Sequence, residues 1–179
     1  MSIDKTQPFF PLRIALLTIS DTRTPETDRS GPMLRKLAEK DGHQIVSALI
    51  IPDDLQIISQ HLSKYSSEDS IDVVICTGGT GLSPRDVTPE AFEQVVDKWI
   101  PGFGELFRML SYQNIGTSTI QSRATAGMKG HTFLFALPGS TGACRDAWQM
   151  ILHEQLDTRH KPCNFAELLP RFKVSTQQN

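Results

Sequence analysis

The sequence predicts a three-layer α/β/α sandwich built around a mostly parallel β-sheet. Short apolar runs alternate with amphipathic helical patterns along the 179 residues, which is the order that right-handed β-α-β units produce. Most of these runs are continuously apolar, as expected for strands that helices cover on both faces. A chain of this length suits one domain, which we place at residues 12–172. Residues 1–11 and 173–179 are expected to be loose ends.

Each element follows from a local pattern. Apolar runs predict strands at residues 14–19, 45–51, 71–76 and 132–137. The first helix is expected after Ser30, a good N-cap residue, and before Gly42, a common stop signal. The second follows Asp53 and Asp54, either of which suits the cap position. The other helices are predicted from Pro89, a first-turn residue, over residues 102–113 and over residues 141–153.

Composition limits the possible partners and location. The formal net charge is −2, so we expect no general affinity for nucleic acid or for an anionic membrane. No apolar run is long enough to cross a bilayer, and the N-terminus lacks a signal-peptide pattern. Three cysteines without a Cys-x-x-Cys pair suit a reducing compartment. We therefore expect a cytoplasmic protein.

The stretch at residues 77–90 is the strongest chemical signal. Thr77, Gly78, Gly79, Thr80 and Gly81 follow the third predicted strand, and such a loop exposes backbone N–H groups that suit a phosphate. It is followed by Arg85 and Asp86, and the aspartate could hold a divalent cation. The spacing matches neither a P-loop nor a dinucleotide fingerprint. A tight strand-to-helix turn with a solvated Asp86 is the alternative.

Other polar residues follow the predicted strands at the same sheet edge. Ligands of open α/β sheets bind beyond the carboxyl ends of the strands. The residues concerned are Ser20 after the first strand, Asp53 after the second, and Pro138, Gly139 and Ser140 after the last. Helix capping is the alternative role for Asp53, Asp54, Ser140 and Thr141.

A second polar group lies at residues 116–127 and includes Ser122 and Arg123. Arginine suits bidentate recognition of a phosphate or a carboxylate. A surface arginine at a polar helix start is the alternative, and this segment taken alone favours it. Glu105 could contact a ligand, or it could be a first-turn carboxylate favoured by the helix dipole.

Five motifs in order resemble the MoaB/MogA family of molybdopterin-binding proteins. They are Thr77-Gly-Gly-Thr-Gly81, Arg85-Asp-Val-Thr-Pro-Glu90, Pro101-Gly-Phe-Gly-Glu105, Gln121-Ser-Arg-Ala124 and Leu137-Pro-Gly-Ser140. The resemblance runs from about residue 13 to residue 172. Residues 143–148 and 162–165 look like the MoaB branch of that family.

The resemblance implies one antiparallel strand, and assembly into a homotrimer or a hexamer of two trimers. It implies molybdenum cofactor biosynthesis, with molybdopterin and ATP as substrates and adenylyl-molybdopterin and pyrophosphate as products. Other proteins of that pathway are candidate partners. The family's functional carboxylates map onto Asp86 and Asp53, with Asp54 the less favoured alternative, and these would hold Mg²⁺ through the substrate phosphates. The candidate substrate- and phosphate-binding residues are Ser20, Thr77, Gly78, Gly79, Thr80, Gly81, Arg85, Glu105, Ser122, Arg123, Pro138, Gly139 and Ser140.

One position departs from the MogA-type loop, which reads Pro-Gly-Ser-Pro-Lys-Ala. Here the lysine position holds Gly142, so one phosphate contact is absent. An adenylyltransferase is the preferred interpretation, and a non-catalytic molybdopterin-binding or scaffold protein of the same pathway is the alternative.

Overall fold

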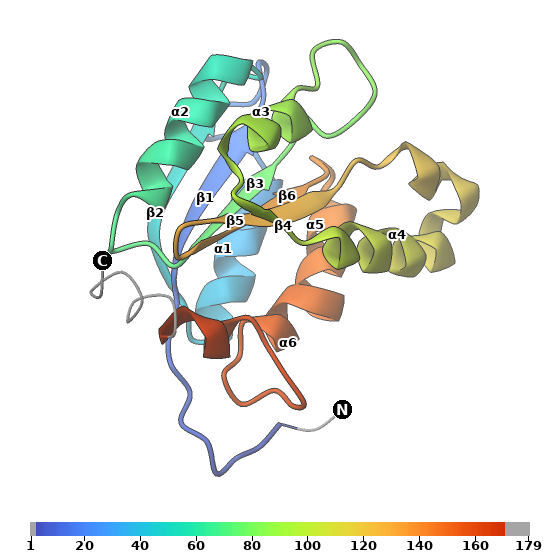
Figure 1. Ribbon diagram of the computed structural model, residues 1–179. Helices are drawn as coiled ribbons and strands as arrows, with labels where there is room; N and C mark the ends of the chain where they lie inside the picture. Colours follow the sequence, from blue (N-terminus) through green and yellow to red (C-terminus); the bar gives the residue numbers. More distant parts are fainter. Residues whose placement is uncertain (1–2, 171–179) are drawn as a thin grey trace.

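The computed structural model describes residues 3–170 and contains a six-stranded sheet in the order β2-β1-β3-β6-β5-β4 (Figure 1). The strands are β1 (Arg13–Ile19), β2 (Gln44–Ile51), β3 (Val73–Thr77), β4 (Lys98–Trp99), β5 (Thr125–Lys129) and β6 (Thr132–Leu137). Neighbours from β2 to β6 pair parallel, whereas β5 pairs antiparallel with both β6 and β4. Within the described residues β5 alone opposes the others, so the predicted sheet with one antiparallel strand is confirmed.

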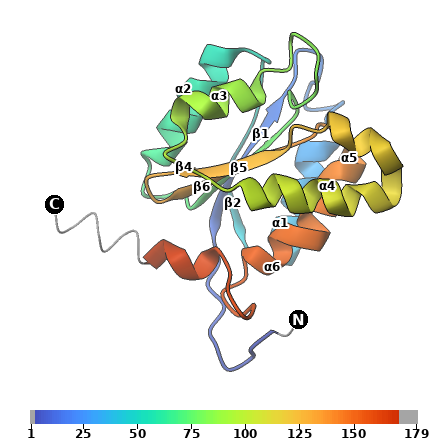
Figure 2. The ribbon, with the colours of Figure 1, turned by 45° about the vertical axis from the view of Figure 1, so that its right-hand side comes forward.

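Helices cover both faces of the sheet (Figure 1, Figure 2). One layer holds α2 (Leu55–Ser66) and α3 (Thr88–Val95). The other holds α1 (Ser30–Lys40), α4 (Pro101–Ile115) and the continuous helix formed by α5 (Thr141–Ala147), the π-helical turn η2 (Trp148–Leu152) and α6 (His153–Gln155). The 3₁₀ turns η1 (Gly116–Gln121) and η3 (Ala166–Leu168) complete the described elements. The predicted three-layer sandwich is confirmed.

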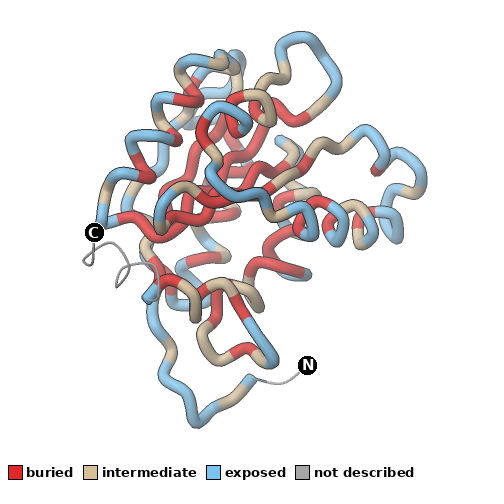
Figure 3. Tube along the Cα trace, viewed as in Figure 1, coloured by how far each residue is buried: buried red, intermediate tan, exposed pale blue. Residues whose placement is uncertain are grey.

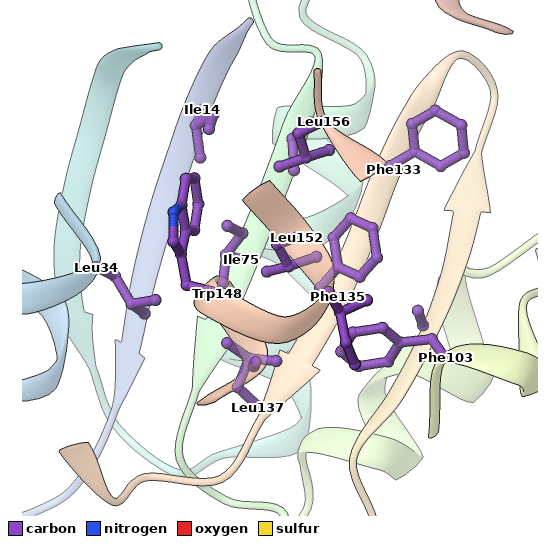
Figure 4. Close-up of a cluster of buried hydrophobic side chains, with 14 of the residues drawn as sticks. Ile14, Leu34, Ile75, Phe103, Phe133, Phe135, Leu137, Trp148, Leu152 and Leu156 are labelled. Carbon is purple, nitrogen blue, oxygen red and sulfur yellow. The ribbon is translucent and has the colours of Figure 1, made fainter. Parts of the chain in front are cut away.

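The core consists of two clusters, one on each face of the buried strands. Figure 3 shows buried residues along the central strands and on the helices that cover them. Figure 4 shows Trp148 within the cluster beneath α1, α4 and α5. Its side chain is fully buried, and the indole Nε1 donates a 2.8 Å hydrogen bond to Asp41 Oδ2. A buried tryptophan whose N–H is satisfied adds apolar area without an unpaired donor.

The strand order places a crevice at one edge of the sheet. β1 lies between β2 and β3, so the chain leaves β1 outward through α1 to β2 and then crosses back through α2 to β3. These two connections cover opposite faces. Loops that diverge in this way open a crevice at the carboxyl ends of the two central strands, which is where open α/β sheets bind ligands.

The four predicted strands are confirmed, but β4 and β5 were not predicted from their residues. Residues 125–129 read Thr-Ala-Gly-Met-Lys, and such a composition does not signal a strand. They form β5 because β6 supplies a continuous antiparallel partner. β4 has two residues, too few for any periodicity.

The predicted cap of α1 is wrong. Ser30 is the first helical residue, and its hydroxyl donates to Gly139 O at 2.9 Å. Asp28 supplies the acceptor instead, because its Oδ1 receives hydrogen bonds from Ser30 N at 2.9 Å and Gly31 N at 3.2 Å. One carboxylate oxygen thus satisfies two amides that have no partner within the helix.

The amino-terminal end was expected to be loose, but residues 3–10 contact the body of the domain. Asp4 N donates to Arg159 O at 2.8 Å, and Phe10 N donates to Thr158 Oγ1 at 3.3 Å. The Arg159 guanidinium lies 4.9 Å from the centre of the Phe9 ring. Residues 3–10 therefore contact the domain, while residues 1–2 and 171–179 lie outside the described part of the chain.

Candidate functional site

A cleft of about 580 Å³ lies at the carboxyl ends of β1 and β3. The predicted residues that line it are Ser20, Asp53, Thr77, Gly78, Gly79, Thr80, Gly81, Asp86, Ser122, Pro138 and Gly139. They come from the segments that follow β1, β2, β3 and β6 and from the end of η1. The remaining predicted residues, Arg85, Glu105, Arg123 and Ser140, do not line it. The topology therefore brings most of the predicted residues together.

Gly78 allows the strands at the base of the cleft to approach closely. Its φ is +113°, and a Cβ there would lie 2.1 Å from Ile19 O at the end of β1. Gly78 N donates to Leu137 O at 3.0 Å, and a Cβ on Gly139 would lie 3.3 Å from Gly78 Cα. The segments after β1, β3 and β6 thus meet at a point that admits no side chain.

Gly79 brings the glycine-rich loop against Asp53. Its φ is +63°, and a Cβ there would lie 2.8 Å from both Asp53 carboxylate oxygens. Asp53 Oδ1 also accepts a hydrogen bond from Val87 N at 3.2 Å. The Asp53 carboxylate is therefore packed between the start and the end of the loop that connects β3 to α3.

Asp54, and not Asp53, caps α2. Its Oδ1 accepts hydrogen bonds from Gln56 N and Ile57 N, both at 2.9 Å. The two adjacent aspartates therefore have different roles. Asp54 caps the N-terminus of α2, whereas Asp53 faces the glycine-rich loop.

Replacement of Asp54 with Ala is expected to lower the free energy of unfolding by about 1 kcal/mol, the usual cost of losing an N-cap acceptor. Ligand affinity of the cleft should stay at the wild-type level. Urea unfolding and calorimetric titration measure the two effects. Asp53→Ala should give the opposite pattern, so a loss of affinity in Asp54→Ala would contradict this division of roles.

Two further carboxylates stand near Asp53. Asp86 Oδ2 accepts a hydrogen bond from Ser83 N at 2.9 Å and lies 2.9 Å from where a Cβ on Gly81 would be. Asp21 Oδ1 accepts from Asp53 N at 3.2 Å, and its Oδ2 pairs with Arg85. Asp21 was not among the predicted site residues, although it directly follows Ser20 at the predicted strand end.

These charges act on Asp53. Burial raises the pKa of its carboxyl above the usual value of 3.8, and the hydrogen bond from Val87 N opposes that shift. The negative charges of Asp86 and Asp21 raise the pKa further, while Arg85 lowers it. A bound cation would relieve this repulsion, and carboxylate oxygens are the ligands that Mg²⁺ prefers.

The carboxylates suit a cation that the substrate helps to hold. Among residues 3–170, no group of three or more His, Cys, Asp or Glu side chains is arranged to bind a metal ion. Mg²⁺ is commonly held by one or two carboxylates together with substrate phosphates and water. Asp53 and Asp86 fit that partial donor set.

The contribution of Asp53 to the stability of the unliganded protein is expected to fall as the pH rises above about 4, and Asp53→Asn should remove that contribution. A carboxyl with a raised folded-state pKa adds stability below its unfolded pKa, and this is lost as the pH rises through the folded value. Thermal unfolding of both proteins between about pH 4 and 7 measures the difference. If the melting temperatures of the two proteins changed in parallel with pH, the assigned contribution of Asp53 would be contradicted.

Several predicted hydroxyl groups are engaged with protein atoms. Thr77 Oγ1 donates to Pro138 O at 3.0 Å and lies 3.0 Å from the buried Cys144 Sγ. Ser20 Oγ accepts from Thr22 N and Arg23 N, each at 3.2 Å. Ser140 Oγ accepts from Ala143 N at 3.2 Å and caps α5. The hydroxyls mainly shape the loops of the cleft.

Glu105 lies apart from the two aspartates. Its exposed side chain lines a separate cleft of about 330 Å³, together with Trp99, Arg108 and Arg123. Arg108 Nη1 donates to Ala124 O at 3.1 Å and holds α4 to the segment before β5. Within one chain, Glu105 therefore does not join Asp53 and Asp86.

A buried polar group beneath the cleft was missed by sequence reasoning. Thr18 Oγ1 donates to Asp28 Oδ2 at 2.7 Å, and both residues line the cleft. The hydrogen bond from Ser30 to Gly139 O joins this group to the loop after β6. The available signal was Asp28 itself, since an aspartate two residues before a helix can satisfy its first amides.

Residues 15–158 match the protein family described as "Probable molybdopterin binding domain". The chain belongs to this family. Within the molybdopterin-binding family, it is 49% identical over 157 residues to molybdenum cofactor biosynthesis protein B of Escherichia coli K12, which covers 88% of this chain and 92% of the relative. The corresponding protein of Bacillus cereus is 48% identical over 147 residues, covering 81% and 86%.

Solved structures of the family share the fold. A crystal structure of molybdenum cofactor biosynthesis protein B has a TM-score of 0.80 and 38% identity, covering 97% of this chain and all of the other. The tungsten cofactor synthesizing protein MoaB of Pyrococcus furiosus has a TM-score of 0.71 and 34% identity, covering 80% and 92%. The family resemblance and the fold expected from the motifs are therefore confirmed. In the part of the chain that the structure describes, no helix has the length and apolar character needed to span a membrane.

Proposed function

We propose that this member of the molybdopterin-binding family adenylylates molybdopterin with Mg-ATP during molybdenum cofactor biosynthesis. The observation that carries the proposal is the packing of the Asp53 carboxylate against Gly79, with Asp86 beside Gly81 on the same loop. This places negative charge beside a loop rich in backbone N–H groups at the edge where such sheets bind ligands.

The proposed chemistry needs alignment more than proton transfer. An oxygen of the terminal phosphate of molybdopterin attacks the α-phosphorus of ATP, forming a new P–O bond. The bond from that phosphorus to the bridging oxygen of the β-phosphate breaks, and pyrophosphate leaves with the electron pair. A phosphate monoester has a second pKa of about 6 and is largely ionised at neutral pH, so no general base is required. When bound, Mg²⁺ neutralises charge on the phosphates.

The roles of the protein follow from this chemistry. Asp53 and Asp86 would hold the cation. The backbone N–H groups of Gly79, Thr80 and Gly81 would contact phosphate, whereas the N–H of Gly78 already donates to Leu137 O. Incubating the protein with Mg²⁺, ATP and molybdopterin tests the proposal, with adenylyl-molybdopterin and pyrophosphate as the expected products. Absence of both products from folded protein with intact pterin binding would overturn it.

A non-catalytic molybdopterin-binding or scaffold role is the second candidate. Gly142 stands where the MogA-type loop has lysine, and a Cβ there would meet nothing within 4 Å. The position therefore has room for a side chain but provides no charge. Tight pterin binding without ATP affinity would favour this candidate, whereas ATP binding that depends on Asp53 and Asp86 would count against it.

We also propose that the protein works in the cytoplasm as a homotrimer or as a hexamer of two trimers. Apolar side chains along α4 support self-association, since Met109, Tyr112 and Ile115 are each more than half exposed, at 61%, 58% and 55%. Exposed apolar patches commonly mark interaction surfaces. Figure 1 shows α4 at the margin of the domain, beyond the other helices of its layer.

Light scattering is expected to give the mass of three or six chains for the wild-type protein. Met109→Glu should shift the mass toward a single chain, because a buried carboxylate without a partner opposes association. Lys129→Gln, which alters the exposed pair with Asp97, is the matched control and should keep the wild-type mass. A single-chain mass for the wild type would contradict the assembly.

A further inference from the structure

The loop that carries Asp86 lies at the surface, where Arg85 pairs with Asp21 and Val87 N donates to Asp53 Oδ1. It leaves β3 after Thr77, passes through the exposed Leu82 and returns at the first turn of α3 (Figure 1, green loop). Asp86 N donates to Ser83 O and Ser83 N donates to Asp86 Oδ2, both at 2.9 Å. These bonds close the loop on itself but do not fix it to the sheet.

Arg123 ties both ends of this loop to the segment before β5. Its Nε donates to Gly81 O at 2.8 Å, and its Nη2 donates to Asp86 O at 2.6 Å. Its backbone N donates to Thr80 O at 3.2 Å. Arg123 therefore contacts the loop at Thr80 and Gly81, in its first half, and again at the residue that bears the carboxylate.

Glu90 contacts the third nitrogen of the Arg123 guanidinium. It lies in the first turn of α3 and forms an ion pair with Arg123 Nη1. Burial raises the pKa of Glu90, but the hydrogen bonds from Arg123 and from its own backbone N–H, with the arginine charge, outweigh burial and lower it. Glu90 is thus ionised at neutral pH and fixes the orientation of the guanidinium plane.

We propose that Arg123 and Glu90 form a clamp that positions Asp86 for the cation, and that neither residue contacts the phosphates. The proposal rests on the proposed function, and both are positioning residues within it. The planar fork of arginine reaches two carbonyls and a carboxylate at once, which the point charge of lysine does not reproduce.

A phosphate-binding role for Arg123 is the competing explanation, and it is the one that the family resemblance implies. The two roles predict opposite behaviour of the loop in the absence of ligand. A clamp stabilises the loop in the free protein, whereas a phosphate ligand acts only when the nucleotide is bound.

Hydrogen exchange of the unliganded protein separates the two roles and does not depend on turnover. The amides of Ser83, Asp86, Val87 and Thr88 are hydrogen-bonded within the loop or to Asp53 and Gly79. Arg123→Lys should accelerate their exchange about tenfold or more, the effect expected from losing charge-assisted hydrogen bonds. Lys129→Gln, at the far end of β5 from Arg123, should leave the exchange of these amides unchanged. Unchanged loop exchange in folded Arg123→Lys would overturn the clamp.

The Glu90→Gln variant gives a second test, because the two roles predict opposite changes in the affinity for Mg-ATP. Removing a negative charge and freeing Arg123 would strengthen binding of Mg-ATP if the arginine were a phosphate ligand. With a clamp, loosening the loop weakens Mg-ATP binding, by about tenfold, and accelerates exchange of the same amides. Tighter nucleotide binding in this variant would overturn the proposal. Wild-type protein that shows no adenylylation refutes the proposed function alone, since the exchange measurements still decide the clamp.

Discussion

Asp86→Asn is expected to reduce the formation of adenylyl-molybdopterin by about a hundredfold or more while pterin binding stays largely intact. The amide oxygen can still accept the hydrogen bond from Ser83 N, so the loop keeps its shape. The negative charge that would hold Mg²⁺ is lost, and charge neutralisation is most of what the protein contributes to phosphoryl transfer. Single-turnover assays with the purified pterin measure the effect.

The control for Asp86→Asn is Asp69→Asn. Asp69 has a fully exposed side chain, and its neighbour His131 lies 3.7 Å away at the end of the sheet remote from the cleft. The substitution removes the same charge without touching the site, so product should form at the wild-type rate. Wild-type turnover in Asp86→Asn would remove this carboxylate from the mechanism.

Gly78→Ala is expected to cause a large loss of stability, of roughly 3 kcal/mol or more. The added Cβ would lie 2.1 Å from Ile19 O at the end of β1. That carbonyl cannot move away easily because β1 pairs with β3, where Leu17 is opposite Cys76. Backbone strain at a positive φ adds to the clash. The midpoint of urea unfolding should fall, and the ligand cleft should open at its base.

The Gly130→Ala variant separates the effect of backbone strain from the effect of a steric clash. Gly130 also has a positive φ, of +56°, but a Cβ there meets nothing within 4 Å. Its replacement should cost about 1 kcal/mol, the strain of a left-handed backbone without a clash. Equal losses for the two variants would show that close packing at Gly78 does not limit stability.

Much of the fold was predictable because the signals were local. The continuous apolar runs that became β1, β2, β3 and β6 and the helical spacing between them are properties of short windows. β5 was not predictable in this way, because its residues become a strand only through pairing with β6. The antiparallel strand was expected from the family resemblance, which carries tertiary information that local composition lacks.

The candidate site was likewise predictable only where local signals or parallel strands determine it. The position of Asp53, Asp86 and the glycines at one edge follows from parallel strands, and the structure places them around a single cleft. Which aspartate caps α2 depended on side-chain direction, which no spacing pattern supplies. Arg123 was assigned to a phosphate through the family resemblance. Its contacts with Gly81, Asp86 and Glu90 depend on segments that approach only in the folded chain.

The pairing of β3 with β6 has a consequence for the order of events during synthesis. Val73 pairs with Phe133, and Pro138 and Gly139 complete the cleft only after β6 has joined the sheet. Such non-local pairings form late and slowly. A nascent chain that has emerged only as far as α4 already carries both aspartates and every glycine of the loop, yet it lacks the wall of the cleft that Pro138 and Gly139 form. We therefore expect no pterin to be captured before nearly the whole domain has left the ribosome.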